Sequence, residues 1–322
     1  MKKYELTNET IASDNGKTLH RIRALMDIEA YGVEIGDLGG YIEKEENLSH
    51  YGDAWVCGDS MVYGDARVFG NVKIYGDARV YDNAKVFGDA WVGGNAKVFG
   101  DARVYGDVEI GGNAGVFENA WISGEARVYD NVWVFGDAWV GGNARVSDNA
   151  RIGGNASVCG DAWVSGNAAV GGNTEVYGDA RIYDNARVFY NARVFDNARI
   201  CDNAKVFGDA RVSGDAMICG DAEVFGHSKV FGHVNVRGDA GIGGDAEINK
   251  SSHILTIGPI GSREDTTTFF RTKENIIKVV CGCFYGTIDE FLAKVELTHG
   301  DNKHGQVYRI AAELAKAQIE LE

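Results

Sequence analysis

A six-residue repeat occupies most of this chain and constrains its fold more than any other feature. The repeat runs from Tyr51 to Ile248 without an insertion or deletion, as 33 units of which YGDARV is typical. Each unit has a variable, often aromatic residue, then Gly or Asp, Asp or Asn, usually Ala, an outward residue and finally Val or Ile. A fixed short period of this kind indicates a solenoid, in which each repeat adds one piece to a continuous core.

The spacing within each unit predicts a strand of about four residues followed by a corner of two. Ala and Val are two positions apart, so on a strand both point to one face and the residue between them points to the other. Gly, Asp and Asn follow, and these residues most easily adopt the positive φ of a tight turn. Three such sides close a triangular coil of 18 residues, which predicts a mainly β protein with a parallel β-helix of about 11 coils. The only proline, Pro259, lies outside the repeat, as expected of a residue that removes a ladder donor.

The units resemble the hexapeptide-repeat signature, in which an aliphatic residue is followed four positions later by a small one, as in V-x-G-D-A-R. Proteins with this signature are left-handed parallel β-helices, and many of them are acyltransferases. The resemblance therefore implies a left-handed coil. The flanking stretches GDLGGYIEKEENLS (36–49) and CGCFYGTIDEF (281–291) are similar to the flanks of solenoid proteins of bacteria and their phages that have no established activity.

The two ends of the chain lack the repeat and predict separate modules. Residues 1–50 contain KKYEL, TLHRIRALMDI and GGYIEKE, whose apolar alternation predicts a small β-rich cap over an otherwise open end of the 51–248 solenoid. In residues 249–322, NKSSHILTIGPIG is expected to add a last partial coil. TTTFFRTK and NIIKVVCGCFYGT predict a hairpin around KEN, and two amphipathic helices follow, giving a C-terminal α+β module.

The acidic composition restricts the classes of partner and the location. A net charge of −15 argues against duplex nucleic acid and against an anionic membrane surface. No apolar run approaches the ~18 residues of a membrane span, and the N-terminal MKKYELTNET lacks the apolar core of a signal peptide. We therefore expect a cytoplasmic protein.

The six cysteines do not suggest a disulfide framework. Cys201 and Cys219 are one coil apart and within disulfide reach, but a reducing cytosol favours two free thiols. Cys281 and Cys283 are expected to point the same way from one strand and to pack against the helices, because a structural zinc site needs a second paired cluster. No metal or cofactor is expected.

Stacking every 18 residues sorts the outward aromatic residues into columns. One column is the candidate interface and consists of Tyr63, Tyr81, Phe99, Phe117, Phe135, Gly153 and Gly171. A long apolar stripe indicates a binding surface, although stacked rings can also cover one another. The variable positions of coils six and seven carry no aromatic residue, which predicts a waist that receives a second chain or a ligand, unless the small residues there are drift.

A second candidate site is a girdle of basic residues on six successive sides, interleaved with aromatic rings. Its members are Arg181, Arg187, Arg193, Arg199, Lys205 and Arg211. Guanidinium groups beside rings suit a phosphate and a base, which makes a small nucleotide a candidate ligand. The alternative is a solvated surface that forms ion pairs with the acidic corners.

The continuity of the repeat weighs against an enzyme. Hexapeptide acyltransferases use coenzyme A and a general-base histidine, commonly delivered with a loop that interrupts the repeat. Here no loop interrupts the repeat, and His227 and His233 lie at different corners. We therefore favour a non-catalytic interaction or scaffold protein, expected to form a homo-oligomer (dimer or trimer) or to bind a protein partner. The alternatives are a hexapeptide-type acyltransferase, or a phage anti-defence protein that sequesters a nucleotide or mimics nucleic acid.

Overall fold

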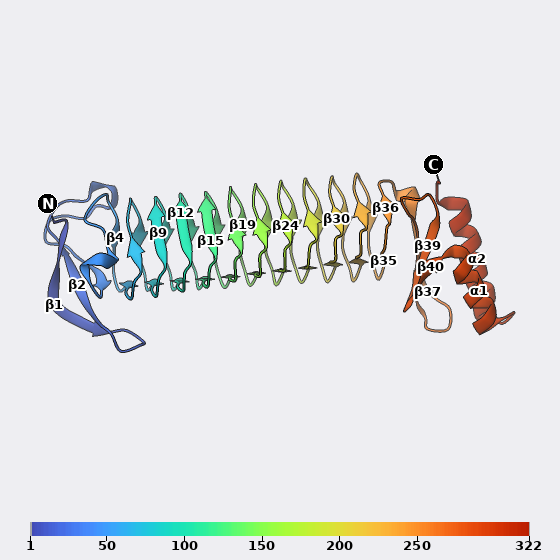
Figure 1. Cartoon of the computed structure of the whole chain (residues 1–322), viewed down its shortest axis with the longest axis horizontal. Helices are drawn as coiled ribbons and strands as arrows, with labels where there is room; N and C mark the ends of the chain where they lie inside the picture. Colours follow the sequence, from blue (N-terminus) through green and yellow to red (C-terminus); the bar gives the residue numbers. More distant parts are fainter. Residues whose placement is uncertain (1, 322) are drawn as a thin grey trace. The chain divides into compact units, whose positions relative to one another are not determined.

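The computed structural model describes residues 2–321 and is mainly β. The described chain divides into two compact units between Gly172 and Asn173. Both contain short parallel strands that pair with the strand 18 residues later, so both are pieces of a three-sided parallel β-solenoid, as predicted (Figure 1). No helix among the described residues is long and apolar enough to cross a membrane.

The first unit begins with the predicted β-rich segment. Strand β1 (Tyr4–Ala12) pairs antiparallel with β2 (Thr18–Ala24), which pairs antiparallel with β3 (Leu38–Ile42). Short 3₁₀ turns cover Glu29–Tyr31 and Glu45–Asn47. Strand β3 then pairs parallel with β5 of the solenoid, so the cap supplies the partner that the first edge of this sheet needs.

The coils of the first unit present three faces. The first face consists of β5 (Met61–Val62), β8 (Arg79–Val80), β11 (Lys97–Val98), β14 (Gly115–Val116), β17 (Trp133–Val134), β20 (Arg151–Ile152) and β23 (Ala169–Val170). The second face consists of β4 (Trp55–Val56), β7 (Lys73–Ile74), β10 (Trp91–Val92), β13 (Glu109–Ile110), β16 (Arg127–Val128), β19 (Arg145–Val146) and β22 (Trp163–Val164). The third face consists of β6 (Arg67–Val68), β9 (Lys85–Gly88), β12 (Arg103–Gly106), β15 (Trp121–Gly124), β18 (Trp139–Val140) and β21 (Ser157–Val158).

Most of these strands have two residues rather than the four that we expected; only β9, β12 and β15 reach four. The residue after each strand still bonds to the next coil, as when the Tyr81 N–H donates to the Val98 carbonyl at 3.0 Å. The chain bends there into the corner, so the regular ladder is shorter than the hydrogen-bonded stretch.

The residues in the core and at the corners are those that the alternation within each repeat unit predicts. The inward Val, Ile and Ala side chains are fully buried, for example Ala96, Val98 and Val116. Gly106 at a corner has φ +94°, and a Cβ atom there would lie 2.6 Å from the Gly124 carbonyl oxygen. Close stacking of coils therefore requires glycine at this position.

The second unit repeats the same plan over fewer coils. Its strands are β24 (Glu175–Val176), β25 (Arg181–Ile182), β26 (Arg187–Val188), β27 (Arg193–Val194), β28 (Arg199–Ile200), β29 (Lys205–Val206), β30 (Arg211–Val212), β31 (Met217–Ile218), β32 (Glu223–Val224), β33 (Lys229–Val230), β34 (Asn235–Val236), β35 (Gly241–Ile242) and β36 (Glu247–Ile248). Every third strand is a ladder neighbour, as in the first unit.

The C-terminal module contains a four-stranded antiparallel sheet and two helices (Figure 1). Its strands are β37 (Ile254–Ile260), β38 (Asp265–Arg271), β39 (Ile277–Cys281) and β40 (Phe284–Thr287), and its helices are α1 (Ile288–His299) and α2 (Lys303–Gln318). The helices and the turn around KEN are as predicted. A core that includes Phe269, Val279, Phe291, Val295 and Ala312 joins sheet and helices.

Two expectations for this module were wrong. ILTIGPI does not extend the solenoid as a partial coil, because β37 pairs antiparallel with β38. NIIKVVCGCFYGT is not one strand either, since the chain turns at Gly282 with φ +57° and β39 pairs with β40. As a result Cys281 is half-buried and Cys283 is exposed, rather than both being packed against the helices.

Candidate functional site

The predicted aromatic column is a continuous stack of rings along one edge of the first face. Adjacent ring centroids are separated by 5.0 Å (Tyr63–Tyr81), 4.9 Å (Tyr81–Phe99), 5.0 Å (Phe99–Phe117) and 5.5 Å (Phe117–Phe135), with nearly parallel planes. Tyr63 packs with Leu19 and Tyr41 of the cap and is buried, so the accessible part of the stack begins at Tyr81. The accessible rings are half-buried by their neighbours.

The column continues with Gly153 and Gly171, where we expected a waist. The waist is not open at Gly153. A Cβ atom on Gly153 would lie 2.4 Å from Cζ of Phe135, so the ring from the preceding coil already covers this glycine. Trp139 covers Gly141 in the same way, with its indole nitrogen 2.7 Å from the position of a Cβ atom. The hollow that small residues would leave is therefore filled by aromatic side chains of the same unit at both positions.

A groove does occur on the first face, two coils earlier than we expected. It encloses about 620 Å³ and is lined by Tyr81, Asn95, Lys97, Phe99, Asn113, Ala114, Gly115, Phe117 and Trp133. Gly115 occupies the outward position that carries Lys97 in the preceding coil and Trp133 in the next one, so the face lacks a side chain there. The ring stack forms one edge of the groove.

The opposite edge of the groove is a ladder of amides. The Asn95 side chain donates to the Asn113 side-chain oxygen at 3.0 Å, and Asn113 donates in turn to Asn131 at 2.9 Å. Trp133 closes one end of the groove, with its ring edge-on to Phe117 at 6.0 Å and 50% of its surface exposed. The result is an apolar depression with a polar border and one lysine, Lys97.

Tryptophans on the other faces add exposed apolar surface. Trp121 and Trp139 are ladder neighbours on the third face and are 40% and 41% exposed. Trp55 is an exception to the outward pattern, because Tyr4 and Gly39 of the cap contact its ring and leave it 2% exposed. The cap thus covers the first tryptophan as well as the first ring of the stack.

The basic girdle of the second unit is divided among the three faces. Its cations are ladder neighbours only in pairs: Arg181 with Arg199, Arg187 with Lys205, and Arg193 with Arg211. Within the girdle, Arg193 forms an ion pair with Glu175 at 3.2 Å and Lys205 forms one with Glu223 at 2.7 Å. The six residues therefore do not converge on one point, and a nucleotide site formed by them stays a prediction.

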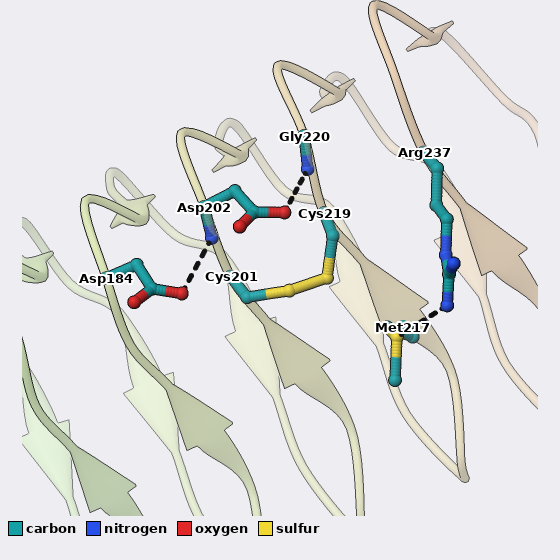
Figure 2. Close-up of a disulfide and its surroundings, with 7 residues drawn as sticks. All are labelled: Asp184, Cys201, Asp202, Met217, Cys219, Gly220 and Arg237. Carbon is teal, nitrogen blue, oxygen red and sulfur yellow. Dashed lines mark hydrogen bonds between the residues drawn. A yellow bond between two sulfur atoms is a disulfide. The ribbon is translucent and has the colours of Figure 1, made fainter.

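Cys201 and Cys219 form a disulfide, contrary to our expectation of free thiols (Figure 2). They occupy the same position in successive coils, with Cα atoms 4.7 Å apart. Among the described residues, Cys201, Asp202 and Cys219 are also the one group of three side chains close enough to share a metal ion. The disulfide occupies both sulfur ligands, and the Asp202 carboxylate accepts from the Gly220 N–H at 2.9 Å.

The two histidines of the repeat are separate, as predicted. His227 Nδ1 lies 3.2 Å from Asp209, and His233 Nδ1 lies 3.2 Å from Asp215, each across one coil. Both imidazoles are largely exposed, so each histidine pairs with its own acidic corner and the two do not form a joint site.

Comparison with known proteins agrees with this architecture. A family model described as the YdcK β-solenoid repeat matches residues 78–94, 126–142 and 180–196, all within the repeat. The chain is a β-helix repeat protein. None of the curated proteins compared matches it. Among solved structures, this β-helix repeat protein is similar to the Francisella novicida UDP-N-acetylglucosamine acyltransferase, with 18% identity over 56% of this chain and 70% of that chain and a TM-score of 0.30. At that identity and TM-score, the similarity has no bearing on activity.

Proposed function

We propose that this β-helix repeat protein is a non-catalytic interaction protein whose first face binds a second copy of the chain. The observation that supports this most is the groove at Gly115, which lies along the stack from Tyr81 to Phe117 and beside the half-exposed Trp133. Such a groove offers an aromatic side chain a place to bury apolar surface, and buried aromatic anchors dominate the energetics of protein interfaces.

The face has the features of a self-complementary surface. The depression at Gly115 and the projecting Trp133 are ladder neighbours, so they lie one coil apart, about 4.8 Å. In a two-fold dimer the same patch meets itself, and a residue that contacts a second residue across the axis is contacted by it in return. A two-fold axis near β14 and β17 would place each copy's Trp133 against the other's Gly115.

Electrostatics give this dimer an unusual salt dependence. Each chain carries a net charge of −15, so two copies repel each other, whereas the contact proposed here is mainly apolar. Salt screens the repulsion and leaves the apolar contact intact. We therefore expect association to strengthen as salt is raised from low to moderate concentrations.

The test is the Gly115→Arg substitution, which fills the groove without a change in fold. A Cβ atom at Gly115 would be 3.7 Å from Phe117 and 3.9 Å from Trp133, which are ordinary contacts, and Arg79 and Arg151 occupy the same outward position on this face. Light scattering should show the wild type at twice the mass of one chain and Gly115→Arg at the mass of a single chain.

The matched control is Ser157→Arg, the same kind of change at the same repeat position on the third face. This variant should remain a dimer. A wild-type protein that stays a monomer at high concentration and moderate salt, or a Gly115→Arg variant that dimerises like the wild type, would show that the first face is not the interface.

A further inference from the structure

A second pocket lies in the C-terminal module. It encloses about 290 Å³ and is lined by the loop after β37, the β39–β40 turn and both helices. The lining residues that matter most for binding are Arg263, Lys294, His299, Tyr308, Phe284 and Phe291. The pocket combines basic side chains with an apolar wall, and the oligomeric face plays no part in it.

The two charged side chains that line this pocket, Arg263 and Lys294, are both basic. Arg263, Lys294 and His299 line it, and none of the described lining residues is acidic. Several other cations of the same module have carboxylate partners: Lys273 with Asp245, Arg309 with Glu296 and Asp301, and Lys316 with Glu313. Arg263 and Lys294 have no such partner among the described residues. In a chain with a net charge of −15, a pocket bordered by unpaired cations attracts anions.

The Arg263 guanidinium lies close to Gly282 at the border of the pocket. A Cβ atom on Gly282 would lie 2.7 Å from Nη1 of Arg263, so the guanidinium rests directly on the turn between β39 and β40. The positive φ of Gly282 and the absence of a side chain make this close approach feasible. Arg263 comes from the loop between β37 and β38, and this approach places its guanidinium beside the β39–β40 turn that borders the pocket.

Tyr308 adds a neutral donor to the lining. Its hydroxyl lies 3.9 Å from the Cys281 sulfur, and burial raises the pKa of Tyr308 to about 12. The hydroxyl therefore stays protonated at neutral pH. The ring of His299 lies beside Tyr308, with centroids 5.7 Å apart, so the histidine and the tyrosine border the same part of the pocket.

The remaining wall is apolar. Phe284 and Phe291 are in ring contact at 5.5 Å, and Val295 continues this wall along α1. We propose that the pocket binds a small phosphate monoester, with the phosphate held by Arg263, Lys294 and His299 and the organic part placed against Phe284 and Phe291. Phosphate is favoured because its dianion matches several cationic donors, and arginine binds it in a bidentate manner. The small volume of the pocket and its mixed basic and apolar lining suit a ligand with a compact apolar part.

Isothermal titration of the full chain with three probes tests this proposal. Phenyl phosphate combines both halves of the expected ligand, benzoate replaces the phosphate by a carboxylate, and inorganic phosphate lacks the apolar body. Phenyl phosphate should bind about tenfold more tightly than either of the others. Equal affinity for benzoate would overturn the assignment to phosphate, and an absence of phenyl phosphate binding would overturn the site.

Two variants and a control locate the binding. Arg263→Gln and Lys294→Gln should each weaken phenyl phosphate about tenfold at low salt, because each removes a charged donor. Both side chains are exposed, so neither change should alter the unfolding midpoint. Lys316→Gln, on the same module but outside the lining, should leave the affinity unchanged. Wild-type affinity in the Arg263→Gln, Lys294→Gln double variant would refute the proposal.

The exposed thiol of Cys283 gives a readout at the site itself. Saturating phenyl phosphate should slow the alkylation of Cys283 by iodoacetamide, followed by peptide mass spectrometry, but should not slow alkylation of Cys57 in the first unit. At a probe concentration equal to the wild-type Kd, the protection should be several-fold weaker in Lys294→Gln than in the wild type, because a tenfold loss of affinity leaves most of the variant's sites empty. Unchanged labelling of Cys283 in the wild type would place any bound phosphate elsewhere and reject this pocket.

Discussion

Lys3 is a buried cation in the N-terminal cap. Its ammonium donates to the carbonyl oxygens of Gly52 at 3.1 Å and Ala54 at 2.6 Å. Burial lowers the pKa of Lys3 from 10.5 to about 8, because the surrounding protein solvates the charge less well than water, and the nearby charge of Asp53 opposes only part of this shift. Lys3 therefore joins the cap to the first coil and makes that contact sensitive to pH.

The direction of the pH effect follows from the number of protons bound in each state. Between pH 8 and 10.5 the unfolded chain holds the Lys3 proton more tightly than the folded chain, so the contribution of Lys3 to the free energy of unfolding rises with pH. A shift of this size corresponds to roughly 3 kcal/mol at most. Toward pH 10 this rise is opposed, because burial also raises the pKa of tyrosines such as Tyr4, Tyr31 and Tyr63, which ionise first in the unfolded chain.

Urea unfolding at pH 7.5, 9 and 10 measures this contribution as the difference between two variants. Relative to the wild type, Lys3→Met should lose the increase in stability between pH 8 and 10. Lys2→Met, at the neighbouring exposed position, should keep it. If Lys3→Met gains stability with pH as the wild type does, another group is responsible for the dependence.

Individual residues differ in how far the sequence predicts their surroundings. The inward Val and Ala and the Gly or Asp corners follow from the period alone, because every unit places them alike. The groove was missed, although its signal is present: Gly115 is a glycine at an outward position that usually carries Arg, Lys or Trp. Whether a missing side chain leaves a groove depends on the neighbouring rotamers, and at Gly153 the ring of Phe135 fills the space instead.

At the scale of elements, the disulfide fastens β28 to β31 through the residues that follow them. Cys201 and Cys219 are 18 residues apart, so the bond closes a loop of one coil in the unfolded chain. By the chain-entropy relation, a loop of this length contributes about 3 kcal/mol to the stability of the folded state. The disulfide therefore stabilises the second unit in particular.

This contribution can be measured by unfolding the oxidised and the reduced protein in urea. Reduction should lower the free energy of unfolding of the second unit by about 3 kcal/mol. The Cys201→Ser, Cys219→Ser double variant should be as stable as the reduced wild type, with or without a reductant. The cap, followed through Trp55, should respond little. Equal stability of the oxidised and reduced wild type would contradict a stabilising role.

Predictability at this scale depends on how regular the element is. The two C-terminal helices were identified from their apolar spacing, and α1 begins with a capping box in which Thr287 and Glu290 bond to each other's backbone N–H groups. The turn at Gly282 was not identified from the sequence, because the alternation of outward and inward residues continues through Cys281-Gly-Cys283 as it would in a single strand. Pairing of β39 with β40 overrides that local pattern.

At the scale of the whole molecule, the 18-residue period determines which side chains stack, although every unit contributes equally to the core. Deleting residues 101–106 removes one unit and brings Ser123 into line with Phe99, in place of Phe117. It also brings Trp121 into line with Lys97, where Gly115 was. The fold should survive, since Ala and Val remain in register, but the ring stack and the groove should not.

A matched deletion of residues 137–154 removes three units and so preserves every column. Circular dichroism should show β structure in both deletion variants. Light scattering should show that the six-residue deletion is a monomer and that the 18-residue deletion is still a dimer. A dimer in both would mean that association does not depend on the stack.

The sequence was sufficient to predict the architecture, because the six-residue period determines at once which residues form strands, which form corners and which lie in the core. It was insufficient for the site, because both pockets depend on side-chain conformations and on contacts between distant segments, such as Arg263 against Gly282. The girdle shows the converse: its six residues are evident in the sequence, yet the fold distributes them over three faces.

The hydrogen bonds between coils also have a mechanical meaning. In the first unit they run from each coil to the next, as from Lys97 N–H to the Ala114 carbonyl at 2.8 Å, and thus along the stacking direction. A tensile load along that direction is carried by the coils in series, so the weakest junction yields first and releases 18 residues of slack. A load across the coils is shared by many junctions at once. The same unit is therefore brittle along its axis and tough across it.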